Sequence, residues 1–365
     1  MSTFDGFIKD DILEVQQWQH GNAPWFQRGW TFQESYFSKR KLLIGDDMAY
    51  MWYEGRIESM DGMWYRSEDG AQLTLDASKS SRQNLMDLWY SMVGFYVRRR
   101  LSYERDRLPA LSGVARALAK SFPDLKYLAG LWKADLHKWL LWMPETTQNY
   151  DDYIKQRQHE YIAPSWSWAS RPGPVSWFLT PPRFRDECPE FELRVANVVT
   201  DEFHPFGRVL SANLELSAKM YKLVPPEEEG ENSSKKSHHI ERASFMDMER
   251  LDYYHFQYTL HSKYGGYVAS LKFDWYEQRK LHDGYGFPYA LIDKMRMLLI
   301  SHFDISDGVL RLDSLADQKV MAGLLVVPTQ NAEEFVRVGM WYSFAKGLGG
   351  GRFWEEVQPQ IMRLV

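Results

Sequence analysis

The hydrophobic pattern changes partway along this chain, and the change limits the folds that the chain can adopt. After about residue 165, apolar residues fall in β-branched or alternating runs separated by Gly, Pro and Asp. Such runs are typical of strands in a mainly antiparallel sheet. The strongest runs are FELRVANVVT (191–200), VLSANLELSAKMYKL (209–223), YALIDKMRMLLIS (289–301), VMAGLLVVP (320–328) and FVRVGMWYSF (335–344).

The part of the chain before residue 165 has mostly helical spacing. Apolar residues at i, i+3 and i+4 predict helices over 7–20, 25–38, 85–96, Leu108–Phe122 and Leu125–Trp142. Asp106 is the expected cap of the Leu108–Phe122 helix. Two short apolar runs, 41–45 and 48–53, predict a β-hairpin.

Helices followed by strands in blocks argue against a doubly wound parallel sheet and predict an α+β chain. We expect a small N-terminal piece over 1–60, a helical segment over 61–160 and a β-rich domain over 161–365. The stretch 225–242 is polar and charged with no apolar period, so it predicts a mobile loop within the β-rich domain.

Composition excludes several classes of protein. The 365 residues carry 44 Lys and Arg against 49 Asp and Glu, so the chain lacks the basic excess of a nucleic-acid binder. The single cysteine, Cys188, rules out an intrachain disulfide framework. No apolar run is long enough to predict a membrane span, and the N-terminus lacks the features of a secretory signal. We therefore expect a cytoplasmic protein with no membrane partner.

Motifs for metal, cofactor or nucleophilic chemistry are weak. His238 and His239 are adjacent and point in different directions, and no metal-ligand spacing occurs. GLGGG (347–351) is followed by Arg where a dinucleotide loop needs Gly, so we expect a simple turn and no cofactor. The arginines of 98–107 are interpreted as a solvated helix end rather than a nucleic-acid surface. We predict no metal site.

The segment WFQRGWTFQESYFSKRKLLIG (25–45) is unusually aromatic. On a helix, Trp30, Gln33, Glu34 and Phe37 occupy neighbouring positions of one side. We expect the two rings to pack, with Gln33 and Glu34 supplying acceptors to the following turn.

The segment YIAPSWSWASRPGPVSW (161–177) is the second aromatic stretch. Pro164 favours an extended backbone before it. In an extended strand, Trp166 and Trp168 share one face, while Ser165 and Ser167 share the other. Two buried indoles whose N–H groups need hydrogen-bond partners are the expected result.

These two segments resemble the fungal heterokaryon-incompatibility (HET) family. RGWTFQESYFSKR is similar to the closing motif of the HET domain, R-x-W-T-x-Q-E followed by L-S-x-R. The segments 106–115, 127–132, 140–143, 163–170 and 323–341 resemble the region that follows the domain. The matching motif residues are Arg28, Trp30, Gln33, Glu34, Ser38, Arg40, Pro164, Ser165, Trp166, Ser167 and Trp168.

The resemblance implies a role in non-self recognition between fungal strains, which in this family can trigger cell death. The opening A-L-S-Y-V-W-G segment of the domain normally lies more than a hundred residues before the W-T-x-Q-E motif, which here follows Trp25 closely. We therefore expect residues 1–60 to be the C-terminal remnant of an α/β HET domain, in a truncated or degenerate paralogue. It would act by protein–protein contacts, including self-association, rather than as an enzyme.

The alternative is a TIR-like NAD glycohydrolase. The HET domain is thought to be distantly similar to TIR domains, some of which cleave NAD with a W-x-x-x-E element. Trp30 and Glu34 reproduce that spacing. Under this alternative the missing N-terminal half is supplied, Glu34 is the catalytic residue and NAD is the ligand; otherwise we assign no catalytic residue.

Overall fold

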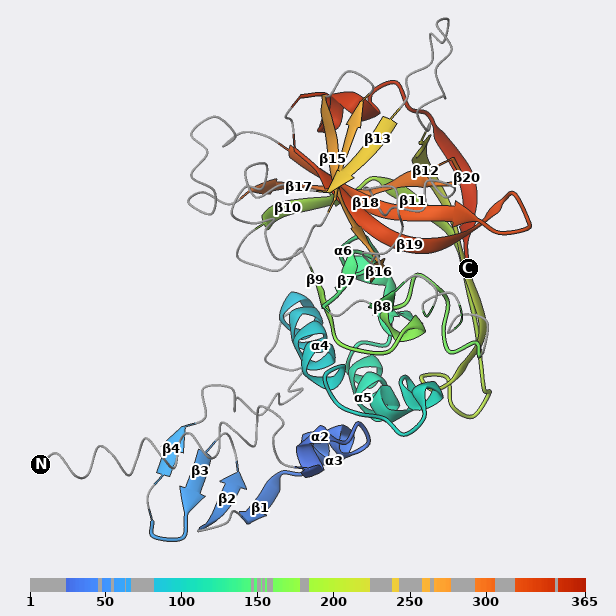
Figure 1. Ribbon diagram of the computed structural model, residues 1–365. Helices are drawn as coiled ribbons and strands as arrows, with labels where there is room; N and C mark the ends of the chain where they lie inside the picture. Colours follow the sequence, from blue (N-terminus) through green and yellow to red (C-terminus); the bar gives the residue numbers. More distant parts are fainter. Residues whose placement is uncertain are drawn as a thin grey trace, which may run out of the picture. The chain divides into compact units, whose positions relative to one another are not determined.

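The protein is a mixed α+β chain whose sheets are mostly antiparallel (Figure 1). The computed structural model describes residues 24–44, 48–53, 56–62, 64–66, 82–145, 148–149, 152, 155, 160–177, 184–223, 238–242, 258–262, 266–276, 293–305, 319–344 and 347–365. The chain divides into two compact units. Unit 1 comprises 1–127 with 200–208, and unit 2 comprises 128–199 with 209–365.

Unit 1 combines short helices with a small meander sheet. Its sheet has the order β1-β2-β3-β4, with antiparallel pairing throughout. Tyr50 and Ile57 are fully buried on one face of this sheet. The elements are α2 (Pro24–Gln27), α3 (Thr31–Phe37), β1 (Arg40–Ile44), β2 (Ala49–Tyr53), β3 (Arg56–Ser59), β4 (Trp64–Arg66), α4 (Arg82–Tyr96), the 3-10 turns η1 (Glu104–Asp106) and η2 (Pro109–Leu111), and α5 (Ser112–Ser121).

The hairpin predicted over 41–53 is confirmed, with Leu42 opposite Met51. The helix predicted over 25–38 is instead two helices, because the backbone between them pairs with Arg100: its N–H donates to Gln27, and its carbonyl accepts from Gly29. Asp106 does not cap the following helix, since its carboxylate accepts a hydrogen bond from the Trp30 indole. The predicted helix over 7–20 lies outside the described residues.

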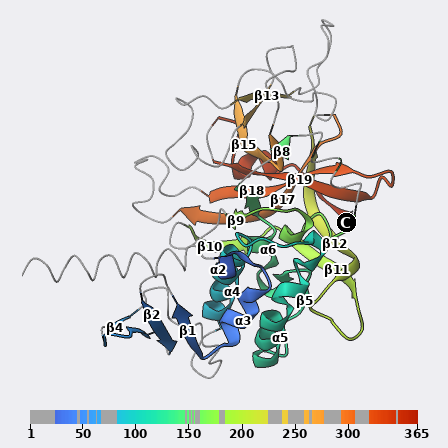
Figure 2. The same cartoon turned by 60° about the horizontal axis from the view of Figure 1, so that its bottom comes forward.

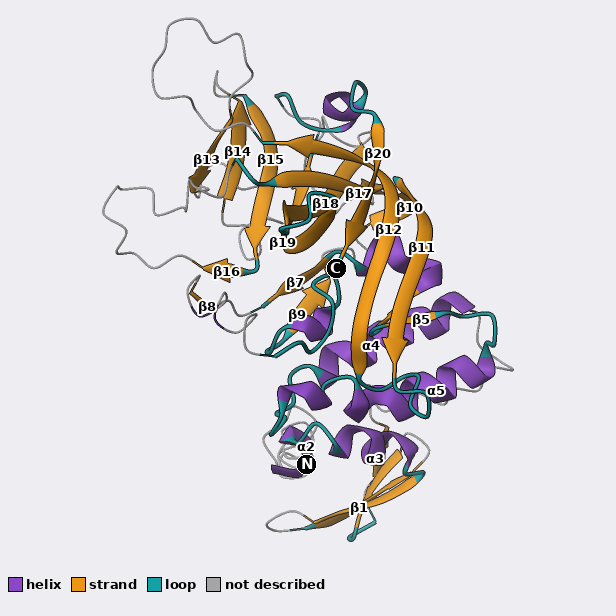
Figure 3. Ribbon diagram, turned by 90° about the vertical axis from the view of Figure 1, so that its right-hand side faces the viewer, coloured by secondary structure: helices purple, strands orange, loops and turns teal. Residues whose placement is uncertain are grey.

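Unit 2 is dominated by a ten-stranded sheet with long strands, which Figure 3 shows in orange. Strand pairs β17–β12, β12–β20, β20–β19, β19–β18 and β18–β17 close a ring of five strands. Its strands are β10 (Phe184–Pro189), β11 (Phe191–Thr200), β12 (Val209–Lys222), β13 (His238–Arg242), β14 (Tyr258–Ser262), β15 (Tyr267–Phe273), β17 (Arg296–Ile305), β18 (Lys319–Pro328), β19 (Glu334–Ser343) and β20 (Pro359–Leu364).

Short elements complete unit 2, and Figure 2 shows several of them from a second direction. Two-stranded pairs form between β5 and β6, β7 and β9, and β8 and β16. The elements are β5 (Tyr127–Leu128), β6 (Leu131–Trp132), η3 (Lys133–Asp135), α6 (Leu136–Trp139), β7 (Trp142–Pro144), β8 (Gln148–Asn149), η4 (Trp168–Ser170), β9 (Val175–Trp177), β16 (Trp275–Tyr276) and η5 (Gly351–Trp354).

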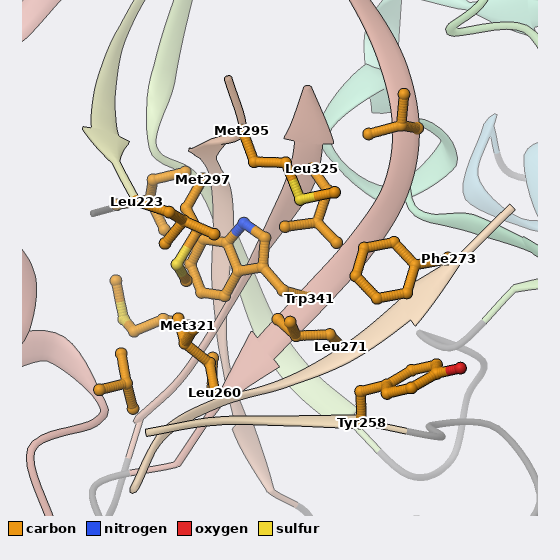
Figure 4. Packing of buried hydrophobic residues seen from close by; sticks show 14 of the residues in the cluster. Leu223, Tyr258, Leu260, Leu271, Phe273, Met295, Met297, Met321, Leu325 and Trp341 are labelled. Atoms are coloured by element: carbon orange, nitrogen blue, oxygen red, sulfur yellow. The ribbon is translucent and has the colours of Figure 1, made fainter. Parts of the chain in front are cut away.

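A cluster of buried apolar side chains fills the large sheet (Figure 4). Trp341 lies at its centre, stacks on Trp354 with ring centroids 5.1 Å apart, and donates its indole N–H to the Leu324 carbonyl. Met295, Met297 and other flexible or branched side chains surround the ring. Such rings bury large apolar areas, so the high aromatic content is used here for packing.

The prediction of a helix over Leu125–Trp142 is wrong. Ala129 and Gly130 have φ angles of 47° and 96°, which turn the chain between β5 and β6. Two consecutive residues in the left-handed region are typical of a tight hairpin turn and end any helix there. The segment 61–160 is therefore mixed rather than helical, since it also holds β4 to β8.

The antiparallel C-terminal β region is confirmed, and four predicted strands match β11, β12, β18 and β19 within about a residue. The predicted mobile loop 225–242 needs correction at its end, because His238–Arg242 pairs with β14 as strand β13. The rest of that loop lies outside the described residues. We predicted domain boundaries at residues 60 and 160, whereas the two compact units divide after residue 127. The connection between β11 and β12 belongs to unit 1.

Candidate functional site

The 25–45 segment is joined to the segment that begins at Asp106 by side-chain hydrogen bonds. Gln33 Oε1 accepts from the Gly113 N–H at 3.0 Å, and the Trp30 indole N–H donates to Asp106 Oδ2 at 3.2 Å. A Cβ atom at position 113 would lie 2.3 Å from Gln33 Oε1, so only Gly permits this approach. Two segments that carry the family resemblance therefore contact each other within unit 1.

We predicted that the side chains of Gln33 and Glu34 accept hydrogen bonds from the turn after their helix. This prediction is wrong for both side chains. Gln33 bonds to Gly113 instead. The backbone carbonyl of Glu34, not its carboxylate, accepts from the N–H and Oγ of Ser38 at 3.1 and 2.7 Å. The Glu34 side chain is exposed.

Two arginines of the motif are also exposed. The Arg28 carbonyl accepts from Thr31 Oγ1 at 2.7 Å, which fixes the start of α3. Arg40 begins β1 opposite Tyr53. In this structure the 25–45 motif forms two short helices, a turn and the first strand of the small sheet.

The arginines of 98–107 are partly solvated, as expected of a helix end: Arg98, Arg100 and Arg105 are exposed, whereas Arg99 and Arg107 pack within unit 1. Arg107 is buried and pairs with Glu104 at 2.5 Å. Arg99 donates to Thr31 Oγ1 at 3.2 Å and lies over the ring of Phe32. Burial lowers the pKa of Arg99 to about 10. These contacts hold Arg99 and Arg107 within unit 1 and leave the other arginines of the cluster exposed.

The PSWSWAS segment is buried up to Ala169, and it is not the extended strand that we predicted. Its backbone makes a turn and then the 3-10 helix η4. The turn forms because the Ser167 N–H donates to the Pro164 carbonyl and Ser167 Oγ accepts from the Ala169 N–H. The predicted alternation of tryptophans on one strand face and serines on the other therefore does not apply, and both Ser165 and Ser167 are buried.

The same segment binds the β5–β6 turn and β7 through single hydrogen bonds. Ser167 Oγ donates to the Ala129 carbonyl at 2.6 Å, and the Trp168 indole donates to the Gly130 carbonyl at 3.0 Å. The Trp142 indole donates to the Trp166 carbonyl at 2.9 Å. Ser167 and Trp168 thus satisfy two backbone carbonyls of the β5–β6 turn, whereas the buried Trp166 indole N–H has no hydrogen-bond partner among the described residues.

Ser165 connects this segment to the strands of the large sheet. Its N–H and Oγ both donate to the Val365 carbonyl, and its Oγ accepts from the Arg337 N–H at 3.0 Å. One serine therefore holds β19 and the end of β20 together beside the motif.

Arg337 is buried in the centre of unit 2. Its guanidinium donates to the carbonyls of Leu140 and Trp142 and forms an ion pair with Asp274, Nε to Oδ2, at 3.4 Å. The guanidinium carbon lies 3.4 Å from the centroid of the Trp142 ring. Several charge-assisted hydrogen bonds of this kind are what a buried arginine requires.

A cavity of about 420 Å³ lies beside this arginine in unit 2. Two basic side chains, Arg171 and Arg337, and two acidic ones, Glu160 and Asp274, line it with Ser165 and other residues. Lys272 is buried nearby; its pKa is lowered by burial, a shift that Asp274 opposes and Arg171 reinforces. Because both basic and acidic side chains line the cavity, and Arg337 pairs with Asp274, the cavity wall lacks the excess of one charge that would favour a charged ligand.

Sequence reasoning missed Arg337, Asp274 and Arg171. The available signal was a charged residue inside an otherwise apolar strand run, as Arg337 is within FVRVGMWYSF. Its partners lie between 63 and 197 residues away in sequence, so no local pattern could identify them.

Cys188 does not line this cavity and is exposed on β10. Within the part of the chain that the structure describes, no group of acidic, His or Cys side chains could hold a metal ion. Of the described helices, none has the length and apolar character to cross a bilayer.

Comparisons of the chain with protein-family models, with curated proteins and with solved structures return no match.

Proposed function

We propose that this chain is a HET-like protein of fungal non-self recognition that acts through protein–protein contacts. The observation that carries the proposal is the pairing of the resembling segments: 25–45 bonds to 106–115, and 161–177 bonds to 127–132 and to 323–341. Segments that resemble successive parts of one family thus form hydrogen bonds with one another. Such contacts are expected if the resemblance reflects a shared fold rather than chance.

Exposed aromatic rings of unit 1 support action by contact. Trp25, Trp30 and Phe37 are 38%, 44% and 52% exposed, and all three belong to the 25–45 segment. Aromatic side chains are enriched where proteins bind one another, because they bury large areas at little entropic cost. A family motif that displays its rings in this way favours recognition over internal packing.

The side-chain geometry gives less support to NAD cleavage. Glu34 is exposed and does not line the described cavity, whose residues all come from unit 2. A catalytic carboxylate needs a shaped site with donors beside it. The proposal therefore assigns Glu34 to the helix end and the exposed rings to recognition.

The test is inducible expression of the chain in a filamentous fungus, with growth and membrane integrity as readouts. We expect growth arrest from the wild-type chain, loss of arrest in a Trp25→Ser, Phe37→Ser variant, and retained arrest in Glu34→Gln. Leu348→Ser, which alters a side chain 54% exposed in unit 2, is the matched control and keeps the response.

Each result separates two explanations. Arrest that Glu34→Gln abolishes, together with a fall in cellular NAD, would replace the proposal with the glycohydrolase. No arrest from a folded, accumulated wild-type chain would overturn the proposal altogether.

A further inference from the structure

The cavity beside Arg337 in unit 2 separates its charged side chains by depth. Arg171, Asp274 and Arg337 are only 5%, 3% and 1% exposed, so they form its floor. Glu160 and Tyr161 also line the cavity but are exposed, which places this end of it at the protein surface. The side-chain charges of the lining are balanced as a whole, whereas those of the floor and those of the mouth are not.

The floor contains more positive than negative charge. Lys272 is buried and interacts electrostatically with Arg171 and Asp274. Among the described residues of unit 2, three buried cations therefore share one buried carboxylate. Arg337 forms an ion pair with that carboxylate, while Arg171 donates to the backbone carbonyl of Asp274, which carries no formal charge. Buried cations are costly unless anions accompany them, so a ligand carboxylate would be stabilised at this floor.

The mouth supplies the opposite charge. Glu160 precedes Tyr161, whose hydroxyl accepts a hydrogen bond from the Ala212 N–H of β12. This bond holds the chain against the strand and keeps Glu160 at the edge of the cavity. A carboxylate in that position attracts an ammonium group and repels an anion.

Apolar side chains make up much of the remaining lining. Ile162 and Val336 contribute aliphatic groups, and Trp142 contributes an aromatic ring. The volume of about 420 Å³ is within the range of small-molecule sites, which are mostly apolar with a few placed polar groups. The cavity therefore suits a small molecule that combines an apolar group with two opposite charges.

We propose that this cavity binds a free α-amino acid with an apolar side chain. Its carboxylate lies beside Arg171, and its ammonium group lies beside Glu160. Such a ligand has no net charge, which agrees with the balanced lining, and its two charged groups match the floor and the mouth. A guanidinium suits a carboxylate because its planar fork can donate two parallel hydrogen bonds. This site is separate from the protein contacts of the proposed function and does not depend on them.

Isothermal titration calorimetry of the purified full chain with L-leucine tests the proposal. We expect a Kd of about 0.1 mM, which is reasonable for so small a ligand. Two analogues test the two charges, since leucinamide lacks the carboxylate and 4-methylpentanoic acid lacks the amine. Each analogue loses one charge-assisted contact, so both should bind about 10-fold more weakly or worse.

Two variants test where the ligand binds. Glu160→Gln should weaken leucine binding about 10-fold and leave the binding of 4-methylpentanoic acid no weaker than before. Ser211→Phe, at an exposed position of the lining, should fill the cavity without changing the buried ion pairs and abolish leucine binding. The matched control is Glu192→Gln, which removes an exposed carboxylate of unit 2 outside the lining and should bind leucine as the wild-type chain does.

Three results would overturn the proposal. The first is a folded wild-type chain that shows neither heat of binding nor a higher melting temperature with leucine up to about 10 mM. The second is 4-methylpentanoic acid that binds as tightly as leucine, because the site would then recognise a simple carboxylate. The third is leucine binding that Ser211→Phe and Glu160→Gln both leave unchanged, which would place the ligand elsewhere on the chain.

Discussion

The two units use the same kind of residue in opposite ways. In unit 2, Trp166 and Trp168 are fully buried and Ser167 bonds to a turn carbonyl. In unit 1, Trp25, Trp30 and Phe37 are exposed on a segment of the same family resemblance. Motif residues can therefore hold a fold together in one place and form a surface in another, and burial distinguishes the two roles.

The cores differ in a similar way. The large sheet encloses a continuous cluster around Trp341, whereas the small sheet buries only Tyr50 and Ile57 fully among its described residues. Small cores contribute little stability, so the small sheet has more to gain from binding a partner than the large one. Four predictions test the contrast, from the largest expected effect to the smallest.

Arg337→Met is expected to have the largest effect, because it removes the buried cation that pairs with Asp274. Leaving a buried charge without its partner costs about 3–5 kcal/mol of unfolding free energy. Chemical denaturation followed by tryptophan fluorescence measures this loss. Arg363→Met, which breaks exposed ion pairs with Glu215 and Glu334, is the control and should cost less than about 1 kcal/mol.

Ser167→Ala should come next. It leaves the buried carbonyl of Ala129 and the N–H of Ala169 without their side-chain partner, at a cost of about 1–3 kcal/mol. The same denaturation experiment applies, with Ser91→Ala on an exposed face of α4 as a neutral control. If the two variants were equally stable, the hydrogen bonds of Ser167 would not contribute to the stability of the fold.

Gly113→Ala tests the junction in unit 1. The added methyl would lie 2.3 Å from Gln33 Oε1, so the end of the Gln33 side chain must shift; we expect a loss of about 0.5–1.5 kcal/mol as its hydrogen bond to the N–H of residue 113 is broken. Gly94→Ala in α4 meets no atom within 4 Å and should stabilise its helix by about 0.5–1 kcal/mol. Opposite signs in thermal unfolding would confirm that the 25–45 segment depends on this close approach.

The pH dependence of unit 1 stability is the smallest expected effect. The folded-state pKa of Lys41 is lowered from 10.5 to about 8 by burial and by Arg99. Between these values the unfolded chain binds more protons than the folded one, so stability rises as pH increases from about 8 towards 10. Thermal unfolding across this window should show the rise, and Lys41→Met should flatten it. A wild-type curve that falls over this window would contradict the buried position of Lys41.

The sequence predicted four strands of the large sheet closely, because strands such as β12 and β19 show their period directly in the order of their residues. It also predicted the β1–β2 hairpin. It failed at Leu125–Trp142, where two left-handed residues at Ala129 and Gly130 override an apolar period that resembles a helix. It failed again at PSWSWAS, where Ser167 Oγ accepts a hydrogen bond from the Ala169 N–H and the chain turns.

The candidate site was predicted less well than the fold. The motif serines and tryptophans could be identified from spacing, but their partners could not, because hydrogen bonds to Ala129, Gly130 and Val365 depend on tertiary structure. Arg337 and Asp274 gave no local signal beyond a charge in an apolar run. Contacts that join distant parts of the chain are set by the packing of whole elements, which a linear pattern does not contain.

The most direct test of action by contact is an NAD assay with the purified full chain. Incubation with NAD, followed by chromatography of nicotinamide and ADP-ribose, measures cleavage. We predict that NAD is unchanged in the presence of the wild-type chain and of Glu34→Gln alike. Release of nicotinamide by the wild-type chain that Glu34→Gln abolishes would contradict the account and identify an enzyme.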